Sequence, residues 1–188
     1  DPESLEPELN IDLVYEALKL GIRDYFSKMG FTKAILGSSG GIDSAVALAI
    51  AVDALGADNV HAILMPSAFS SIHSVEDATQ LSINLGNPYE VISIENIYQD
   101  FLLTLQPVFE NLPFNVAEEN IQSRTRGNLL TAIANKFGYI LLNTSNKSEL
   151  ATGYGTLYGD IAGAIRILSD CYKSQAYTLA DFIDKQKI

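Results

Sequence analysis

A turn rich in glycine and serine occupies residues 37–44, and its composition suits an anion. The sequence there reads Gly-Ser-Ser-Gly-Gly-Ile-Asp-Ser. Gly40 and Gly41 permit backbone angles that a side chain would forbid, and they let main-chain N–H groups come close to an anion. Asp43 and Ser44 follow at the expected start of an apolar helix, where serine is a favoured cap and the helix dipole is positive. The pattern therefore predicts a phosphate-binding turn at a helix N-terminus.

Hydroxyl groups separate this turn from a plain strand-to-helix connection, which two glycines alone would fit equally well. Ser38, Ser39 and Ser44 crowd hydroxyls around the glycines, which suits a pyrophosphate and serves no packing purpose. No Gly-Lys-Ser/Thr follows at the spacing that the Walker loop requires. The turn is thus expected to bind pyrophosphate by a different arrangement.

A second polar cluster, residues 143–149, directly follows an expected buried strand at 139–142. Within it, Glu149 offers a hard oxygen ligand, and together with Asp43 it could hold Mg²⁺ against the phosphates of ATP. The segment also fits a helix start with Glu149 in its first turn. The two interpretations are compatible, and both stay open here.

Three further positions could contact a nucleotide. Met65 ends an apolar run and begins a serine-rich loop, which predicts either an adenine and ribose wall or a plain connection. Asp160 ends a stretch rich in glycine and tyrosine, residues 153–160, that we expect to cover a ligand. Its carboxylate could orient or deprotonate a nucleophile, or it could serve as a turn residue. Lys173, near the start of the last helix, could reach phosphate as a point charge.

The expected helix at 117–137 carries two arginines, Arg124 and Arg126. Because they are two residues apart, they point to different faces of the helix, and only one is expected to face a ligand. A surface ion pair is the competing interpretation, and such a pair would contribute little stability. On the residues alone, the surface ion pair is favoured.

The rest of the pattern predicts an α/β fold. Short apolar runs indicate strands, and segments with helical spacing of apolar residues indicate helices. We expect strands at residues 33–37, 60–65, 89–94 and 139–142, and helices at 11–30, 43–55, 74–85, 95–110, 117–137 and from about 170 onward. This alternation predicts an open, mostly parallel, Rossmann-like sheet with helices on both faces. The loops that leave the C-terminal ends of such strands line the ligand crevice.

Length and composition predict one globular domain over residues 11–188. Residues 1–10, which lack an initiator methionine, look like a linker remnant, and the family resemblance given below implies truncation at the C-terminus. The chain has 188 residues, of which 47% are hydrophobic. Its net charge of −11 argues against broad binding to nucleic acid or to a membrane surface. The single cysteine excludes an internal disulfide, and no signal peptide or membrane span is apparent, so we expect a cytoplasmic protein.

Four ordered motifs between residues 33 and 173 resemble those of the NAD synthetases, which belong to the ATP pyrophosphatases with an SGGxDS loop. They are SGGIDS at 39–44, EENIQSR at 118–124, TSNKSE at 144–149 and LYGD at 157–160. The second and fourth look more like the synthetase domain of the glutamine-dependent enzymes. The resemblance implies a fold of the adenine nucleotide α-hydrolase type. It also implies ATP-dependent amidation of deamido-NAD to NAD through a nicotinate adenylate, with release of AMP and pyrophosphate.

Residue roles follow from the resemblance by motif match. ATP binding falls on the turn and two later positions: Gly37, Ser38, Ser39, Gly40, Gly41, Ile42, Asp43, Ser44, Thr144 and Lys173. Mg²⁺ falls on Asp43 and Glu149, and deamido-NAD on Asn120, Arg124 and Glu149. Catalytic roles fall on Asp43 and on Asp160, which would lie near the arrival point of ammonia. For Arg124, the resemblance thus replaces the surface interpretation.

Two positions depart from the family pattern. Leu157 and Ala164 stand where the short, ammonia-dependent enzymes carry a lysine and an aspartate for deamido-NAD, so these contacts must differ here. The resemblance implies an upstream glutaminase domain that supplies ammonia in the full-length protein, and a homodimer or higher homo-oligomer. Two alternatives stay open: another ATP pyrophosphatase that acts as an amidase or thiolase, and a truncated ATP-binding module without activity.

Overall fold

A parallel sheet of five strands forms the centre of the protein, with its strands in the order β3-β2-β1-β4-β5. The structure, a computed structural model, describes residues 10–110 and 112–186. The strands are β1 (Ala34–Gly37), β2 (Val60–Leu64), β3 (Tyr89–Val91), β4 (Ile140–Asn143) and β5 (Ile165–Arg166). All four neighbouring pairs run parallel. The fold class predicted from the sequence is therefore confirmed.

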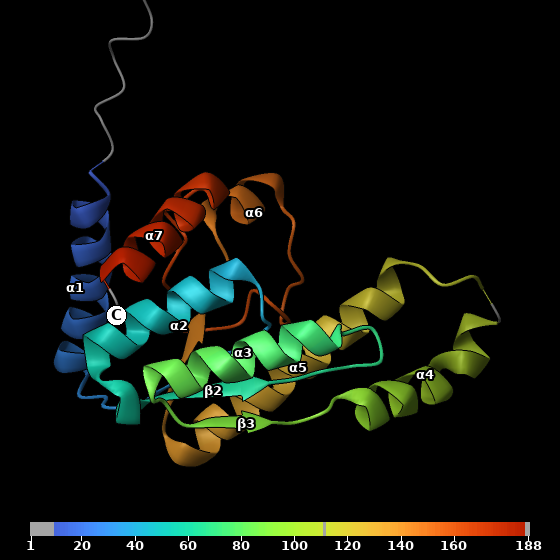
Figure 1. Cartoon of the computed structure of the whole chain (residues 1–188). Coiled ribbons are helices and arrows are strands. Elements are labelled where there is room, and N and C mark those ends of the chain that lie inside the picture. Colours follow the sequence, from blue (N-terminus) through green and yellow to red (C-terminus); the bar gives the residue numbers. More distant parts are fainter. Residues whose placement is uncertain (1–9, 111, 187–188) are drawn as a thin grey trace, which may run out of the picture.

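Helices cover both faces of the sheet (Figure 1). They are α1 (Ile11–Met29), α2 (Ile42–Leu55), α3 (Ile72–Leu85), α4 (Glu95–Phe109), α5 (Val116–Phe137), α6 (Lys147–Thr152) and α7 (Lys173–Gln186), with a short 3₁₀ helix, η2 (Ala57–Asn59), after α2. No helix in the described part of the chain is both long enough and apolar enough to cross a membrane.

Successive residues of the strands pack on opposite faces of the sheet. In β1, Ala34 and Leu36 belong to a core shared with α1, α2, α3 and α7, whereas Ile35 packs with α5 on the other face. All three side chains are fully buried. Burial on both faces explains why these strands read as continuous apolar runs rather than alternating ones.

Two elements differ from the expected pattern. Strand β5 has only two residues, Ile165 and Arg166, and so falls below any recognisable strand pattern. The expected third strand, 89–94, pairs as a strand only to Val91, yet the N–H of Ile92 still donates to the Leu64 carbonyl oxygen at 2.8 Å. Most of the expected linker remnant, residues 1–9, lies outside the described residues; the side chain of Asn10 caps α1.

A polar cluster joins α1 to α2 at the edge of the core. The Tyr15 hydroxyl donates to Asp53 Oδ2 at 2.7 Å, and Lys19 Nζ lies 2.9 Å from the same oxygen. Burial alone would raise the pKa of Asp53, but the hydrogen bonds from Tyr15 and Lys19 outweigh it and hold this pKa below its ordinary value. The pKa of Tyr15, in contrast, is raised by burial and by its hydrogen bond to Asp53.

The depressed pKa of Asp53 predicts an acid-sensitive contribution to stability. A carboxyl with a lower pKa in the folded state stabilises the fold above its unfolded pKa of about 3.9, and this stabilisation is lost as the pH falls through the folded pKa. We expect Asp53→Asn to lower the free energy of unfolding by about 1–2 kcal/mol at pH 7. Urea unfolding of both proteins from pH 7 to pH 3 should show the difference shrinking below about pH 4.

Asp24→Asn is the matched control for Asp53→Asn. Asp24 also forms an ion pair on α1, with Lys28, but half of the Asp24 side chain is exposed. An exposed pair of this kind contributes at most about 0.5 kcal/mol. Equal losses for the two variants at pH 7 would contradict the role given to the Asp53 cluster.

Candidate active site

The glycine and serine turn connects β1 to α2 at the C-terminal edge of the sheet. Helix α2 begins at Ile42, and Gly41 takes the cap position without a side-chain hydrogen bond. Ser44 therefore does not cap the helix, contrary to expectation. Ser44 is the third residue of α2, and its hydroxyl turns back, donating to the Gly41 carbonyl at 2.8 Å and accepting from the Ser39 N–H at 3.2 Å. The first N–H groups of α2, which have no partner within the helix, remain available to an anion.

Gly40 holds the turn against the start of α3. Its φ angle is +79°, in the left-handed region that glycine occupies without strain. A Cβ atom at this position would lie 2.2 Å from the Ser74 carbonyl oxygen. The turn therefore requires glycine here for two separate reasons.

Two adjoining cavities open at this edge of the sheet. The larger, of about 400 Å³, lies between the ends of β1, β2 and β4, the loop after β2, and α5. The smaller, of about 130 Å³, lies between the turn and the start of α6. Both are lined by Ser39, Thr144 and Asp160. Strands β2 and β3 are added on one side of β1, and β4 and β5 on the other, so the strand order reverses between β1 and β4. The cavities lie at this point, where α/β folds bind ligands.

Many of the residues expected to bind ligands line these cavities. The larger cavity takes Gly37, Ser38, Ser39, Met65, Thr144 and Asp160, and the smaller takes Ser39, Gly41, Asp43, Ser44, Thr144, Glu149 and Asp160. The others lie elsewhere: Ile42 packs against the core and Gly40 against α3. Lys173, Asn120 and Arg124 do not line either cavity.

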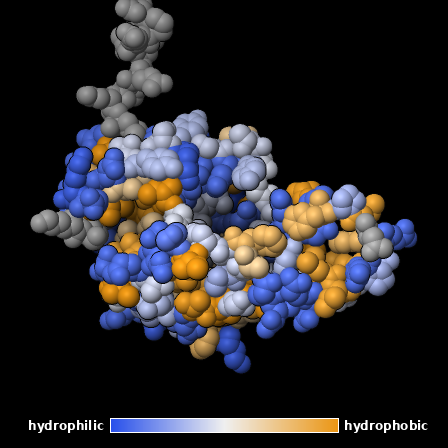
Figure 2. Space-filling view, turned by 45° about the vertical axis from the view of Figure 1, so that its right-hand side comes forward, coloured by the Kyte–Doolittle hydropathy of each residue, from blue (hydrophilic) through white to orange (hydrophobic). Residues whose placement is uncertain are grey.

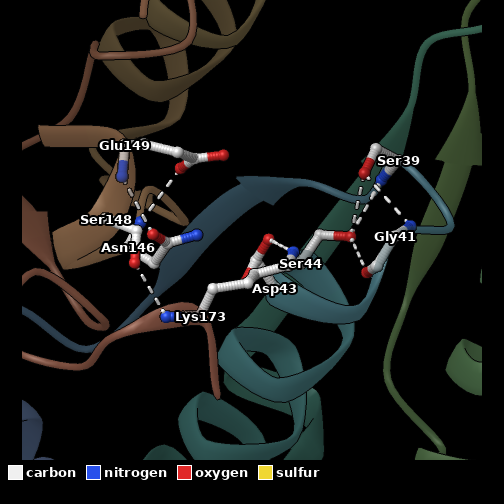
Figure 3. A network of polar contacts seen from close by, with 8 residues as sticks. All are labelled: Ser39, Gly41, Asp43, Ser44, Asn146, Ser148, Glu149 and Lys173. Atoms are coloured by element: carbon white, nitrogen blue, oxygen red, sulfur yellow. Dashed lines mark hydrogen bonds and ion pairs between the residues drawn. The ribbon is translucent and has the colours of Figure 1, made fainter. Parts of the chain in front are cut away.

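Asp43 and Lys173 meet across the site, although 130 residues separate them in the sequence. Lys173 Nζ donates to Asp43 Oδ2, while the other oxygen, Oδ1, is buried and has no hydrogen-bond partner among the residues that the structure describes. The Lys173 main-chain N–H donates to Ser148 Oγ at 3.1 Å, which ties the start of α7 to α6. Figure 3 shows this pair between the turn and the start of α6.

The structure confirms one of the two interpretations of Glu149, the helix start. Glu149 is the third residue of α6, and its Oε2 accepts from the Asn146 N–H at 3.1 Å. In return, Asn146 Oδ1 accepts from the Glu149 N–H at 3.1 Å. This reciprocal pair caps the helix (Figure 3). Glu149 nevertheless lines the smaller cavity with Asp43, so its role as a cap leaves the predicted metal-ligand role possible, and that role stays a prediction.

Asp160 acts as a turn residue and also faces both cavities. Its Oδ1 accepts from the Thr156 N–H at 2.5 Å, and its own N–H donates to Ser123 Oγ at 2.9 Å. The loop lies tightly on α5, because a Cβ atom at Gly127 would lie 2.7 Å from the Tyr158 carbonyl oxygen. The expected covering loop is thus fixed against α5 at one end.

The two arginines of α5 lie on different sides, as their spacing predicts. Arg124 is exposed, and its Nε donates to the Leu157 carbonyl at 3.2 Å. Asn120 lies on the same side, where its Oδ1 accepts from the Thr156 hydroxyl at 2.8 Å. Arg126 instead lines the larger cavity.

Several cavity residues were missed in the reasoning from sequence. On α5 they are Ser123, Arg126, Gly127 and Leu130, and near β4 they are Asn143 and Ala162. A glycine within a long helix was the available signal for Gly127, since it marks close approach of another chain segment. Asn143 is the last residue of a buried strand, and its side chain donates to the Asp160 carbonyl at 2.6 Å.

The family model described as NAD synthase matches residues 14–185 of this sequence. The chain belongs to the NAD synthase family. Among curated members, the glutamine-dependent NAD(+) synthetase of Synechocystis is 51% identical over 96% of this chain. The chain spans about a third of the length of that relative.

Two solved structures of NAD synthase proteins superimpose closely on the chain. The glutamine-dependent NAD+ synthetase of Acinetobacter baumannii, solved in complex with ADP, gives a TM-score of 0.93 at 44% identity, over 97% of this chain and 35% of the other. The NH3-dependent NAD synthetase of Campylobacter jejuni gives a TM-score of 0.86 at 33% identity, over 94% of this chain and 75% of the other. The resemblance drawn from the four motifs is therefore confirmed.

Proposed function

We propose that the chain catalyses ATP-dependent amidation of deamido-NAD to NAD, with AMP and pyrophosphate as the other products. The observation that carries the proposal is the smaller cavity, where Ser39 and Asp43 of the turn face Glu149 of the next polar cluster. A pyrophosphate site beside two carboxylates suits cleavage of ATP between its α and β phosphates. The names of the relatives support NAD as the product, and the motif resemblance supports deamido-NAD as the acceptor.

The proposed first step makes the carboxylate of nicotinate reactive. One of its oxygens attacks the α-phosphorus of ATP, the bond from that phosphorus to the β-phosphate oxygen breaks, and pyrophosphate leaves. The N–H groups at the start of α2 and the hydroxyls of Ser39 and Ser44 hold the departing pyrophosphate. Positioning and neutralisation of charge are the main tasks of the protein in this step.

The proposed second step replaces AMP by ammonia. The nitrogen attacks the carbonyl carbon of the adenylate, the carbon–oxygen bond to AMP breaks, and the proton that the nitrogen loses is released to solvent. We assign Asp160 to orient the ammonia, because its carboxylate is fixed by the Thr156 N–H at the boundary of both cavities. Asn120 and Arg124, which contact Thr156 and Leu157 of the 156–160 loop, are assigned to deamido-NAD.

Mg²⁺ fits the residues of the smaller cavity. No cluster of three or more metal-ligating side chains occurs among residues 10–110 and 112–186, so a protein-only cage is not available there. Mg²⁺ is commonly held by one or two carboxylates together with substrate phosphates, which matches Asp43 and Glu149. The buried, unpartnered Oδ1 of Asp43 is the atom best placed as a ligand. When bound, the ion would neutralise charge on the phosphates.

Ammonia is proposed to come from a glutaminase domain in the full-length protein, because the Synechocystis relative is named glutamine-dependent.

Homodimerisation is proposed on a separate observation. Apolar side chains are exposed on α4 and its connection to α5, namely Phe101, Leu103, Val108, Leu112, Phe114 and Val116. Figure 2 shows hydrophobic residues gathered on this projecting part of the molecule. A cytoplasmic location remains an expectation that rests on the single cysteine.

Pyrophosphate release from Mg-ATP tests the proposed reaction. Release should require deamido-NAD, and NAD should form in the same tube when ammonium chloride is supplied. Xanthosine monophosphate in place of deamido-NAD tests for another amidase of the ATP pyrophosphatase type. Binding of ATP without pyrophosphate release would instead support a binding module without activity.

Arg124→Ala should raise the KM for deamido-NAD more than the KM for ATP. Loss of a hydrogen bond to a charged group costs about 1.5–3 kcal/mol, which corresponds to a change of about tenfold or more. Lys136→Ala is the control, because Lys136 is an exposed cation at the far end of the same helix. Equal increases in both KM values for Arg124→Ala would argue against this assignment.

A further inference from the structure

The segment that follows β2 contains a turn, residues 67–70, that is closed by its own hydrogen bonds. The N–H of Ser70 donates to the Ser67 carbonyl at 3.0 Å, and the N–H of Ser67 donates to Ser70 Oγ at 3.0 Å. The Ser67 hydroxyl also accepts from the Phe69 N–H at 3.4 Å. Because these bonds lie within the turn, it behaves as one unit, and its place in the protein depends on what holds it from outside.

The position of this turn shapes the larger cavity. Met65 and Pro66, which lead into the turn, and Ser70 within it all line that cavity. Arg126, another lining residue, contacts the same segment: its Nε donates to the Met65 carbonyl at 3.1 Å, and its Nη2 donates to Ser67 Oγ at 3.4 Å. A displacement of the turn therefore moves part of the cavity wall.

Two side chains that line neither cavity hold the turn to the helices behind it. Glu95 is the first residue of α4, and its Oε2 accepts from the Ala68 N–H at 2.7 Å. Gln122 lies on α5, and its Oε1 accepts from the Ser67 hydroxyl at 3.0 Å. The turn is thus attached to two different helices through side chains outside the cavities.

The Glu95 carboxylate is itself held in place. Gln99 Nε2, one turn further along α4, donates to Glu95 Oε1 at 2.9 Å. The hydrogen bonds from Gln99 and from the Ala68 N–H hold the pKa of Glu95 below its ordinary value, so its charge is present at neutral pH. A hydrogen bond to a charged acceptor is roughly twice as strong as one between neutral groups. The contact with Ala68 is therefore a strong attachment for a short turn.

We propose that Glu95 and Gln122 are positioning residues, which fix the turn 67–70, and through it the wall of the larger cavity, in the place that a bound substrate requires. Both act through the turn alone. If the turn occupies this place for only part of the time, the apparent affinity for the substrate falls in proportion. The inference rests on the proposed function, in that ATP is the substrate used to detect the effect.

Cleavage by chymotrypsin tests the attachment of the turn without any ligand. Phe69, within the turn, is 68% exposed, and chymotrypsin cuts after it when the segment opens locally. Glu95→Ala and Gln122→Ala should each speed this cleavage about fivefold, since each removes one hydrogen bond that holds the turn. Cleavage after Tyr154, an exposed residue of another loop, is the internal reference and should not change. Unchanged cleavage after Phe69 in both variants would overturn the proposal.

Calorimetry with ATP and steady-state kinetics test the effect on the site. Glu95→Ala and Gln122→Ala should each weaken ATP binding and raise the KM for ATP about fivefold, with little change in kcat or in the midpoint of urea unfolding. Glu95→Gln, which keeps an acceptor oxygen, should recover part of the lost affinity. Asp100→Asn removes an exposed charge from the same helix and should bind ATP as the wild type does.

Two results would contradict the proposal even if the turn opens more readily in the variants. Unchanged affinity for ATP would show that the place of the turn does not matter to the site. A lower midpoint of urea unfolding, with KM raised equally for ATP and deamido-NAD, would assign Glu95 and Gln122 to general stability instead. A wild type that binds ATP but forms no NAD would contradict the proposed reaction, whereas the cleavage and calorimetric results would still decide the role of these two residues.

Discussion

Asp43→Asn is expected to lower the rate of pyrophosphate release about a hundredfold or more, equivalent to about 3 kcal/mol of transition-state stabilisation. Asparagine keeps the shape of the side chain but removes the charge that faces the smaller cavity. The fold should survive, because the ion pair with Lys173 is partly exposed and such pairs contribute about 1 kcal/mol or less. A pyrophosphate-release assay measures the rate, and urea unfolding separately measures the free energy of unfolding.

A readout other than activity tests the metal assignment of Asp43. Mn²⁺, a spectroscopic substitute for Mg²⁺, should bind the Asp43→Asn protein with ATP more weakly than it binds the wild type with ATP. Asp77→Asn is the control, because Asp77 is an exposed carboxylate on α3 away from both cavities. Unchanged Mn²⁺ affinity or unchanged pyrophosphate release in Asp43→Asn would refute the assignment.

The sequence predicted the sheet well because its strands are buried on both faces. Runs such as Ala34–Gly37 and Ile140–Asn143 contain few polar residues. The strands, and their order along the chain, could therefore be recognised without tertiary information. Strand β5 could not be recognised, since two residues carry no pattern. Its pairing with β4 depends on the path of the preceding loop.

The sequence predicts an anion site at the turn, and this role stays a prediction, but the contacts within the turn could not be predicted. The direction of the Ser44 hydroxyl depends on where α2 begins, and helix boundaries are uncertain from sequence by a few residues. The contact between Asp43 and Lys173 joins α2 to α7 across 130 positions, and no local pattern connects them. Contacts of this length follow from the packing of α7 on α2.

The choice between Arg124 and Arg126 shows where reasoning from sequence ends. Helical geometry placed the two on different faces, and the structure bears this out. Which face meets the cavity depends on how α5 packs on the sheet, through Leu129, Leu130 and Ile133. The motif resemblance favoured Arg124 for a ligand, and that role of Arg124 stays a prediction. The position of Arg126 in the wall of the larger cavity could be seen only in the structure.

Gly40→Ala is expected to destabilise the protein and to weaken ATP binding about tenfold or more. Its methyl group would lie 2.2 Å from the Ser74 carbonyl oxygen and 2.8 Å from two further backbone atoms of Ser74, none of which can turn aside as a side chain could. The positive φ adds strain of about 1–2 kcal/mol. The turn must therefore move away from α3, and the N–H groups that are proposed to bind the phosphates move with it. Urea unfolding and calorimetry with ATP measure the two effects.

Gly86→Ala separates strain from collision. Gly86 ends α3 with a φ of +72°, nearly the same as that of Gly40, but a Cβ atom there has nothing within 4 Å. This variant should lose about 1 kcal/mol of stability and keep its affinity for ATP. If Gly40→Ala loses no more stability than Gly86→Ala and binds ATP as well, the contact with Ser74 does not shape the turn. A larger loss in Gly40→Ala, coupled to weaker ATP binding, would mean that the contact with Ser74 of α3 sets the geometry of the proposed phosphate site.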